Sequence, residues 1–222
     1  MTQGKPMPPD RSGASSIWVM PWNAEGLSND SVRRSVELAS MAFGHATEGR
    51  DPQRLRADLR DDRSPHMRRR RAITVLSLVG MASMAIVSLF QMGVIRHLPD
   101  PPSRRFHSDK VNASSTAYHY GVPDGPLSLA AHALNAVLAG LGGAGRARRA
   151  PWIPLLAAGK AAAGAGVAAK YLFHQMPVVE QAWCGYCIVD ALAHLGACAL
   201  ALPEAIEAAR EHRWSEPTGG RS

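Results

Sequence analysis

The sequence predicts an all-α integral membrane protein, a four-helix bundle that follows a polar, mostly disordered N-terminal tail. Two contrasting regions predict this fold class. Residues 1–71 contain 13 Lys/Arg and 9 Asp/Glu with scattered Pro, Gly and Ser, a composition typical of disordered tails. Residues 72–202 are instead dominated by Ala, Leu, Val, Ile and Gly. We therefore divide the chain into an N-terminal tail (1–71), a membrane domain (72–205) and a C-terminal tail (206–222).

The N-terminal tail holds one helical candidate, at residues 28–44, where apolar residues recur at helical spacing after possible caps. It is either a partner-binding helix or a short helix that lies on the membrane surface or frays. The stretch that begins at Met67 resembles a secretory signal, with four arginines before an apolar run. That run is longer than a signal core, so we interpret it as a retained membrane span.

Four apolar segments form the predicted spans, at residues 73–95, 127–143, 152–173 and 183–202. The first carries only Gln91 as a strongly polar side chain and is long enough to cross a hydrocarbon core of about 30 Å. The other three are weaker signals, because Ala- and Gly-rich helices also occur in soluble cores. Small residues, as in "AAGKAAAGAGVAAK", nevertheless allow helices to approach closely in lipid.

Arginine placement predicts the orientation of the bundle. Eight arginines lie within the 20 residues before the first span, against four Lys/Arg in the whole 96–126 loop, and "RARR" joins the second and third spans. By the positive-inside rule both chain ends are cytoplasmic, in a multi-pass protein of the cell inner (cytoplasmic) membrane. Because these clusters mark the ends of apolar runs, the net charge of +7 predicts no nucleic-acid partner; membrane lipid is the expected surroundings.

A Cys-x-x-Cys pair, Cys184 and Cys187, stands at the start of the fourth segment, in "EQAWCGYCIVDALAHLGACALALPEA". The predicted orientation puts it on the extracytoplasmic, oxidising side. A cysteine at a helix N-terminus is favoured as thiolate, the nucleophilic form, by unpaired backbone N–H groups and the helix dipole. Such a pair can take electrons from a dithiol in solution. A membrane quinone is the natural lipid-soluble acceptor of two electrons.

Two alternatives remain for this pair. It could be half of a zinc site, although His174 and His194 do not stand at zinc-motif spacing and no second Cys-x-x-Cys exists. It could also be two inert thiols in an apolar helix. We predict no metal site, and we expect Cys198, about 16 Å further along the helix, to be a small buried hydrophobic residue.

The layout resembles the vitamin K epoxide reductase family, particularly its bacterial branch, over residues 73–205. The resemblance rests on "WCGYCIVDALAHLGACALALPEA" at the outer end of the fourth span, and on "LPDPPSRRFHSDKVNASSTAYHYGVPDGPLSLAAHAL" between the first and second spans. It implies a four-helix bundle around a quinone, capped by the first outer loop. By this resemblance Cys187 reacts with the quinone and Cys184 exchanges with an incoming thiol. Ser114 matches the loop Ser/Thr near the quinone.

The sequence departs from the family pattern at two places. Many members have two loop cysteines that carry electrons to the Cys-x-x-Cys pair, whereas this loop has none, and Ser108 stands where the second would fall. The tyrosine that often follows the second active cysteine by four residues is replaced by Ala191. The relay is therefore shortened or supplied in trans, with a thioredoxin-fold dithiol protein attacking the Cys184–Cys187 disulfide directly.

Polar side chains inside the predicted spans are costly and are usually paired or functional. We consider that Lys170 and Asp190 pair across the third and fourth spans; alternatively, Lys170 extends towards the membrane surface and Asp190 faces a wet cavity. His132 and Asn135 enter the second span. They hydrogen-bond either to quinone carbonyls or between helices.

The resulting functional prediction is an enzyme: a membrane thiol–disulfide oxidoreductase that passes electrons from an extracytoplasmic dithiol protein to a quinone (ubiquinone or menaquinone). Cys184 and Cys187 are its predicted catalytic residues, and Cys187, Ser114, His132 and Asn135 its predicted quinone-binding residues. The first alternative is a non-catalytic quinone- or lipid-binding membrane protein of the same fold. A metal-binding membrane protein is a further alternative.

Overall fold

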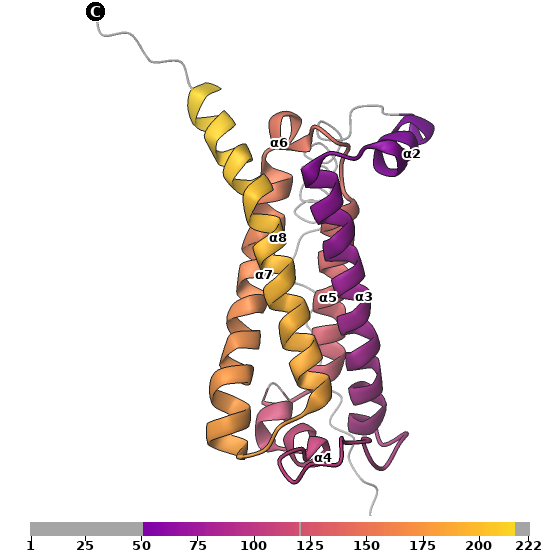
Figure 1. Cartoon of the computed structure of the whole chain (residues 1–222), viewed down its shortest axis with the longest axis vertical. Helices are drawn as coiled ribbons and strands as arrows, with labels where there is room; N and C mark the ends of the chain where they lie inside the picture. Colours follow the sequence, from indigo (N-terminus) through magenta and orange to yellow (C-terminus); the bar gives the residue numbers. More distant parts are fainter. Residues whose placement is uncertain (1–50, 120, 216–222) are drawn as a thin grey trace, which may run out of the picture. The chain divides into compact units, whose positions relative to one another are not determined.

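The computed structural model describes residues 51–119 and 121–215, and their regular structure is helical (Figure 1). In chain order the elements are α2 (Pro52–Asp61), α3 (Pro65–Gln91), α4 (Ser108–Asn112), the 3₁₀ helix η2 (Ser115–Tyr118), α5 (Asp124–Gly140), α6 (Arg146–Arg149), α7 (Trp152–Lys170), the π-helix η3 (Tyr171–Glu180) and α8 (Gly185–Ser215). The all-α prediction is confirmed. The helix predicted at residues 28–44 lies outside the described part of the chain.

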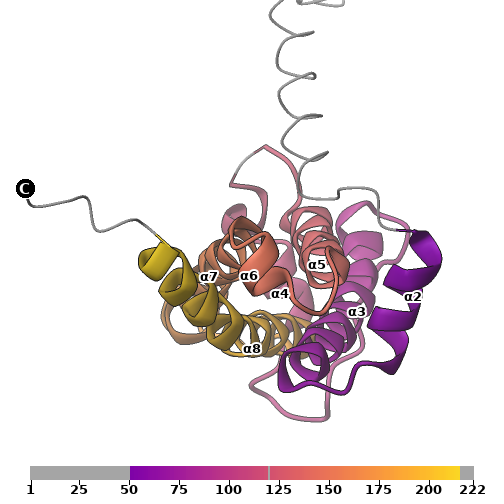
Figure 2. The same ribbon diagram turned by 90° about the horizontal axis from the view of Figure 1, so that it is seen from above.

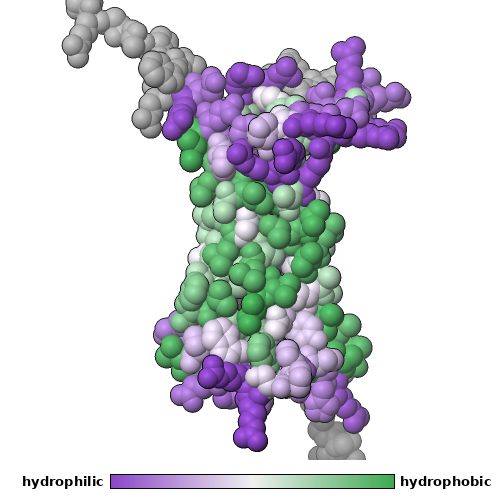
Figure 3. Space-filling view, viewed as in Figure 1, coloured by the Kyte–Doolittle hydropathy of each residue, from purple (hydrophilic) through white to green (hydrophobic). Residues whose placement is uncertain are grey.

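Four helices pack together as the predicted bundle. Helix α3 packs against α5 and α8, and α7 packs against α8 and α5, as the end-on view shows (Figure 2). The outer surface carries an apolar band between two polar ends (Figure 3). Side chains such as Val137 and Val167, each 61% exposed among protein atoms, leave an apolar surface of the kind that lipid covers.

Three helical stretches are long and apolar enough to cross a membrane: Pro65–Gln91, Trp152–Glu180 and Gly185–Glu211. They confirm three of the four predicted spans and a multi-pass membrane protein. Helix α5 has 17 residues, at the lower limit of the roughly 17–25 that a span needs. It begins at Asp124 and ends at Gly140, and the chain turns at Gly142 with a φ of 76°, so the second helix has the predicted length but lies three residues earlier in the chain.

Arg70 and Arg146 hold the C-terminal end of α5 and the turn that follows it in place. The Arg70 guanidinium, 2% exposed, donates to the carbonyl oxygens of residues 139, 141, 142 and 143 at 2.7–3.2 Å. The Ala139 carbonyl belongs to the last turn of α5, which a helix end leaves without an intrahelical partner, and the other three belong to the turn that follows the helix. Arg146 forms a buried bidentate pair with Glu204 at 2.8 and 2.7 Å. Two arginines that the sequence offers as orientation signals are therefore also structural.

The predicted tail differs from the structure in its last part, since residues 52–61 and 65–71 are helical. Arg71 of α3 donates to the carbonyl oxygens of Leu59, Arg60 and Asp62, which ties the end of α2 to the start of α3. The backbone N–H and hydroxyl of Ser64 donate to the Asp62 carboxylate, and these bonds lower its pKa below the usual value.

The other chain end also departs from the predicted boundary. Helix α8 continues through residue 215, beyond the predicted start of the C-terminal tail at 206. The sequence "IEAAREHRWS" is rich in good helix formers, so nothing in it stops the helix. Figure 1 places the start of α3, α6 and the end of α8 at one end of the bundle and α4 at the opposite end. The α4 end is where the cysteine pair lies.

Candidate active site at the start of α8

The cysteine pair lies where the chain enters α8. Cys184 immediately precedes the helix and Cys187 lies in its first turn; their sulfur atoms are at disulfide-bonding distance, with Cα atoms 5.2 Å apart. Cys184 is 0% exposed and Cys187 is 9% exposed. Both pack with Val111 and Met176 in one apolar cluster. The pair is therefore closed off from solvent.

The loop between α3 and α5 covers the two cysteines and forms backbone hydrogen bonds with Trp183, the residue just before Cys184. Phe106 and Trp183 form an isolated parallel bridge. The His107 N–H donates to the Trp183 carbonyl and the Trp183 N–H donates to the Arg105 carbonyl, both at 2.9 Å. We call residues 105–107 together with Trp183 the clasp. It holds the loop directly against the start of α8.

Asn112, at the end of α4, contacts both sulfur atoms. Its side-chain Nδ2 donates to Cys184 Sγ at 3.2 Å and to the Ser108 carbonyl at 2.8 Å, and its Oδ1 lies 3.5 Å from Cys187 Sγ. The backbone N–H of Cys187 also donates to Cys184 Sγ, at 3.1 Å. Cys184 therefore receives two hydrogen bonds, which favour the thiolate when the pair is reduced. No sequence pattern pointed to this role of Asn112, because it lies 72 residues before Cys184 in a short loop helix.

A polar network fixes Asn112 from the side of the membrane helices. Gln91, the last residue of α3, donates from Nε2 to the Asn112 carbonyl at 3.2 Å and to Asp124 Oδ1 at 2.7 Å. Its Oε1 accepts from the Gly125 N–H at 3.0 Å, and Tyr171 donates to the other Asp124 oxygen at 2.7 Å. Three helices thus hold the segment whose amide faces the sulfurs. The lone polar residue of the first predicted span is part of this network.

Comparison with known proteins agrees with this arrangement. The Vitamin K epoxide reductase family profile matches residues 71–202, more than half of the chain. The chain belongs to the vitamin K epoxide reductase family. Searches of curated proteins and of solved structures found no match. Membership, together with the apolar helices, places the chain in a family of membrane oxidoreductases.

The two departures from the vitamin K epoxide reductase pattern are buried here. Ser108, at the place of the missing loop cysteine, is 0% exposed, and its N–H and hydroxyl both donate to Asp100, at 2.8 and 2.6 Å. Ala191 is also buried. Ser114 is half-buried and its hydroxyl accepts from the Ala117 N–H at 3.4 Å as the cap of η2. Ser108 therefore contributes to loop structure, and the quinone role of Ser114 stays a prediction.

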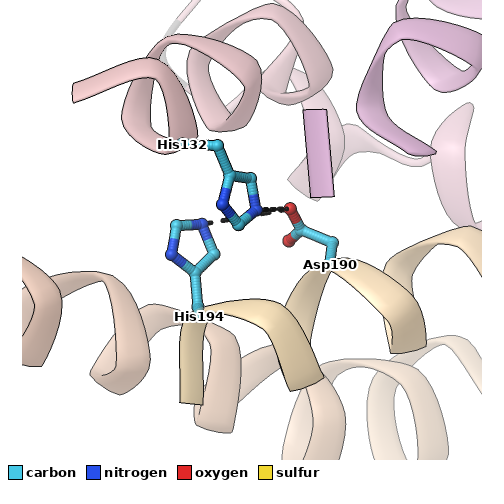
Figure 4. A group of neighbouring side chains, drawn as sticks. All are labelled: His132, Asp190 and His194. Atoms are coloured by element: carbon cyan, nitrogen blue, oxygen red, sulfur yellow. Dashed lines mark hydrogen bonds and ion pairs between the residues drawn. The ribbon is translucent and has the colours of Figure 1, made fainter. Parts of the chain in front are cut away.

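The polar residues of the bundle pair differently from the Lys170–Asp190 hypothesis, which is wrong. Asp190 Oδ1 accepts from Ser128 Oγ at 2.6 Å and lies 2.9 Å from His132 Nε2 (Figure 4). Lys170 is exposed at the end of α7. The reason is that Asp190 faces α5, where the side chains of Ser128 and His132 are its neighbours. His194, one turn further along α8, joins the same group.

The deeper predicted residues have partners inside the bundle. Asn135 Oδ1 accepts from Lys160 Nζ at 2.8 Å, and Lys160 also donates to the Ala131 carbonyl. Asn135 thus forms a hydrogen bond between helices, which is one of the two roles predicted for it. Cys198 is a free, half-buried thiol that packs against the apolar core between α3, α7 and α8. Quinone binding by His132 and Asn135 stays a prediction.

Proposed function

We propose that this protein is a thiol–disulfide oxidoreductase that passes two electrons from an extracytoplasmic dithiol protein, through Cys184 and Cys187, to a membrane quinone. The observation that supports it most is one side chain, Asn112, in contact with both sulfurs of a buried, disulfide-distance pair. An amide there can donate to one sulfur and accept from the other. It therefore suits a pair that alternates between disulfide and dithiol.

In the first half-reaction, a partner thiolate attacks Cys184 Sγ and the Cys184–Cys187 bond breaks, so that Cys187 leaves as thiolate. The second partner thiol then attacks the mixed disulfide. Its attack releases Cys184, whose sulfur accepts hydrogen bonds from Asn112 and from the Cys187 amide, and donors of this kind make a thiolate a better leaving group. The partner becomes a disulfide and the pair becomes a dithiol.

In the second half-reaction the pair is reoxidised. A bound quinone supplies the acceptor for two electrons and two protons. Cys187, the more exposed of the two cysteines, is proposed to face the acceptor. After its thiolate takes up a proton, the S–H can donate to Asn112 Oδ1. Cys184, held as thiolate, then re-forms the Cys184–Cys187 bond as two electrons leave the pair. Cys187 releases one proton, and the second proton that the quinone takes up comes from water.

The surroundings of Cys187 fit a quinone ring. Its sulfur lies in a cluster of apolar side chains that includes Val111 and Met176, with Leu172 and Ile188 packed against them. Small-molecule sites are lined mainly by apolar side chains with a few polar groups. Ser114 lies three residues beyond Val111 in the same loop, whereas the His132 side chain is 0% exposed and held by Asp190. We therefore propose Cys187 and Ser114, ahead of His132, as the residues that contact the quinone.

Burial of Cys184 places a condition on the partner protein. Because this sulfur is 0% exposed, a partner thiol reaches it only after the clasp opens. The clasp is a single bridge made of two backbone hydrogen bonds, an amount of structure that local opening can release. The proposed electron donor is a thioredoxin-fold dithiol protein that binds the loop between α3 and α5 and so keeps the clasp open.

The test is to trap the redox state of the pair in isolated membranes. Cys198→Ala serves as the background, so that only Cys184 and Cys187 can take a mass-tagged alkylating reagent. Thiols are counted at rest, after addition of a reduced thioredoxin-fold protein, and after addition of a ubiquinone or menaquinone analogue. Cys184→Ala and Cys187→Ala, each in the same background, identify which single thiol is labelled.

We expect a disulfide at rest, two tags after the reduced protein, and none after the quinone. If the reduced protein opens the pair but quinone fails to close it, the acceptor is wrong. If both thiols stay reduced whatever is added, the pair is structural. The non-catalytic quinone- or lipid-binding alternative then replaces the proposal.

A further inference from the structure

A second chemical centre lies one helical turn beyond Cys187 and has no part in the steps above. Asp190 and His194 of α8 meet His132 of α5 inside the bundle, and one ligand atom from each lies within 4.8 Å of the others (Figure 4). The His132 and His194 side chains are 0% and 6% exposed, and that of Asp190 is 17% exposed. Buried ionisable groups at this depth are costly unless paired or functional.

Two glycines on the other two helices make room for the imidazoles. A Cβ atom at Gly80 of α3 would lie 2.2 Å from His132 Nε2, and one at Gly164 of α7 would lie 2.9 Å from His194 Nδ1. The two rings stack with their centroids 3.9 Å apart and an interplanar angle of 16°. All four bundle helices therefore shape this centre, and the rings are fixed by packing before any ligand binds.

We propose that His132, Asp190 and His194 form a binding site for a divalent first-row transition-metal ion such as Zn²⁺. Asp190 Oδ1 lies 2.9 Å from His132 Nε2 and 3.9 Å from His194 Nε2. Ligands about 2.0–2.1 Å from a tetrahedral ion are about 3.3 Å apart, so the observed distances lie on either side of the required one. Binding of one ion would bring His194 Nε2 about 0.6 Å closer to Asp190 Oδ1 and would turn the two stacked rings towards the ion.

The donor set decides which class of ion fits. Two imidazoles and one carboxylate suit zinc and its first-row neighbours, whereas calcium and magnesium require oxygen ligands. Ser128 Oγ, 2.6 Å from Asp190 Oδ1 and 3.4 Å from His194 Nε2, adds an oxygen as a fourth donor atom at the same place. The carboxylate of Asp190 offsets part of the charge of the ion.

This inference does not rest on the redox function, since metal binding is measured without quinone or partner. The full chain is purified in detergent, stripped with a chelator, and titrated with Co²⁺, whose visible d–d absorption reports tetrahedral coordination. We expect one Co²⁺ per chain, displaced by Zn²⁺, and a thermal unfolding midpoint that rises with metal concentration. Asp190→Asn and His194→Gln should each lose the absorption. His174→Gln, at an exposed histidine on η3, should keep it.

The proposal is overturned if the wild-type chain binds no Co²⁺ above the level of His194→Gln, or if His174→Gln removes the absorption equally. The cluster is then a hydrogen-bonded unit without a metal. In that unit both Nδ1 atoms are buried and have no hydrogen-bond partner among the described residues. If a variant fails to fold, the wild-type titration and the unfolding midpoint still decide the matter.

Discussion

Removing the amide of Asn112 should make the cysteine pair harder to reduce. The hydrogen bond from Asn112 Nδ2 reaches Cys184 Sγ at 3.2 Å inside a buried site, and a hydrogen bond to a charged group is worth about 1.5–3 kcal/mol. A disulfide sulfur is a much weaker acceptor, so Asn112→Ala destabilises mainly the reduced state. For a two-electron couple this corresponds to a potential about 30–65 mV more negative.

The assay equilibrates the Cys198→Ala protein with defined thiol–disulfide ratios and counts free thiols by mass tagging. Ser115→Ala, an exposed position in the neighbouring 3₁₀ helix, is the matched control and should leave the potential unchanged. Asn112→Asp should move the potential further in the same direction than alanine does, because a carboxylate repels the thiolate. A potential for Asn112→Ala within about 10 mV of the parent, or about 0.5 kcal/mol, would refute the reasoning.

Two further predictions concern stability in detergent. Glu204→Gln should cost about 3–5 kcal/mol, because it leaves the buried Arg146 guanidinium without its bidentate partner, whereas the exposed Glu211→Gln should change stability by about 0.5 kcal/mol or less; denaturant titration followed by circular dichroism checks both. Gly80→Ala should cost about 1–3 kcal/mol through overpacking. Gly159→Ala, where a Cβ meets nothing within 4 Å, should cost nothing; equal effects of the two alanines would contradict the packing argument.

Local patterns predicted the membrane helices and the cysteine pair. Apolar length alone located α3, α7 and α8, because a hydrocarbon core imposes a minimum length. The Cys-x-x-Cys spacing fixed the sulfur pairing in the same way, since one helical turn brings the two residues together. Features encoded within one segment are therefore accessible from the sequence.

Features that join distant segments were missed or misassigned. Lys170 and Asp190 lie at similar predicted depths, but depth does not say which face of a helix meets which neighbour. Asp190 instead found His132 and Ser128. Similarly, Asn112 reaches the sulfurs only because the loop folds back over α8. Charge counts also treated every arginine as a surface signal, although Arg70 is buried as a helix cap.

In the proposed relay, the clasp has a consequence for the selection of electron donors. Loop, Asn112 and disulfide form one continuous unit, so exposure of the sulfur is a conformational event that precedes the chemistry. The observed exchange rate is then the intrinsic rate multiplied by the fraction of open molecules. A small thiol must wait for spontaneous opening, whereas a protein that binds the open loop increases that fraction. Donors are in this way distinguished by how well they bind the open loop, before any covalent bond forms or breaks.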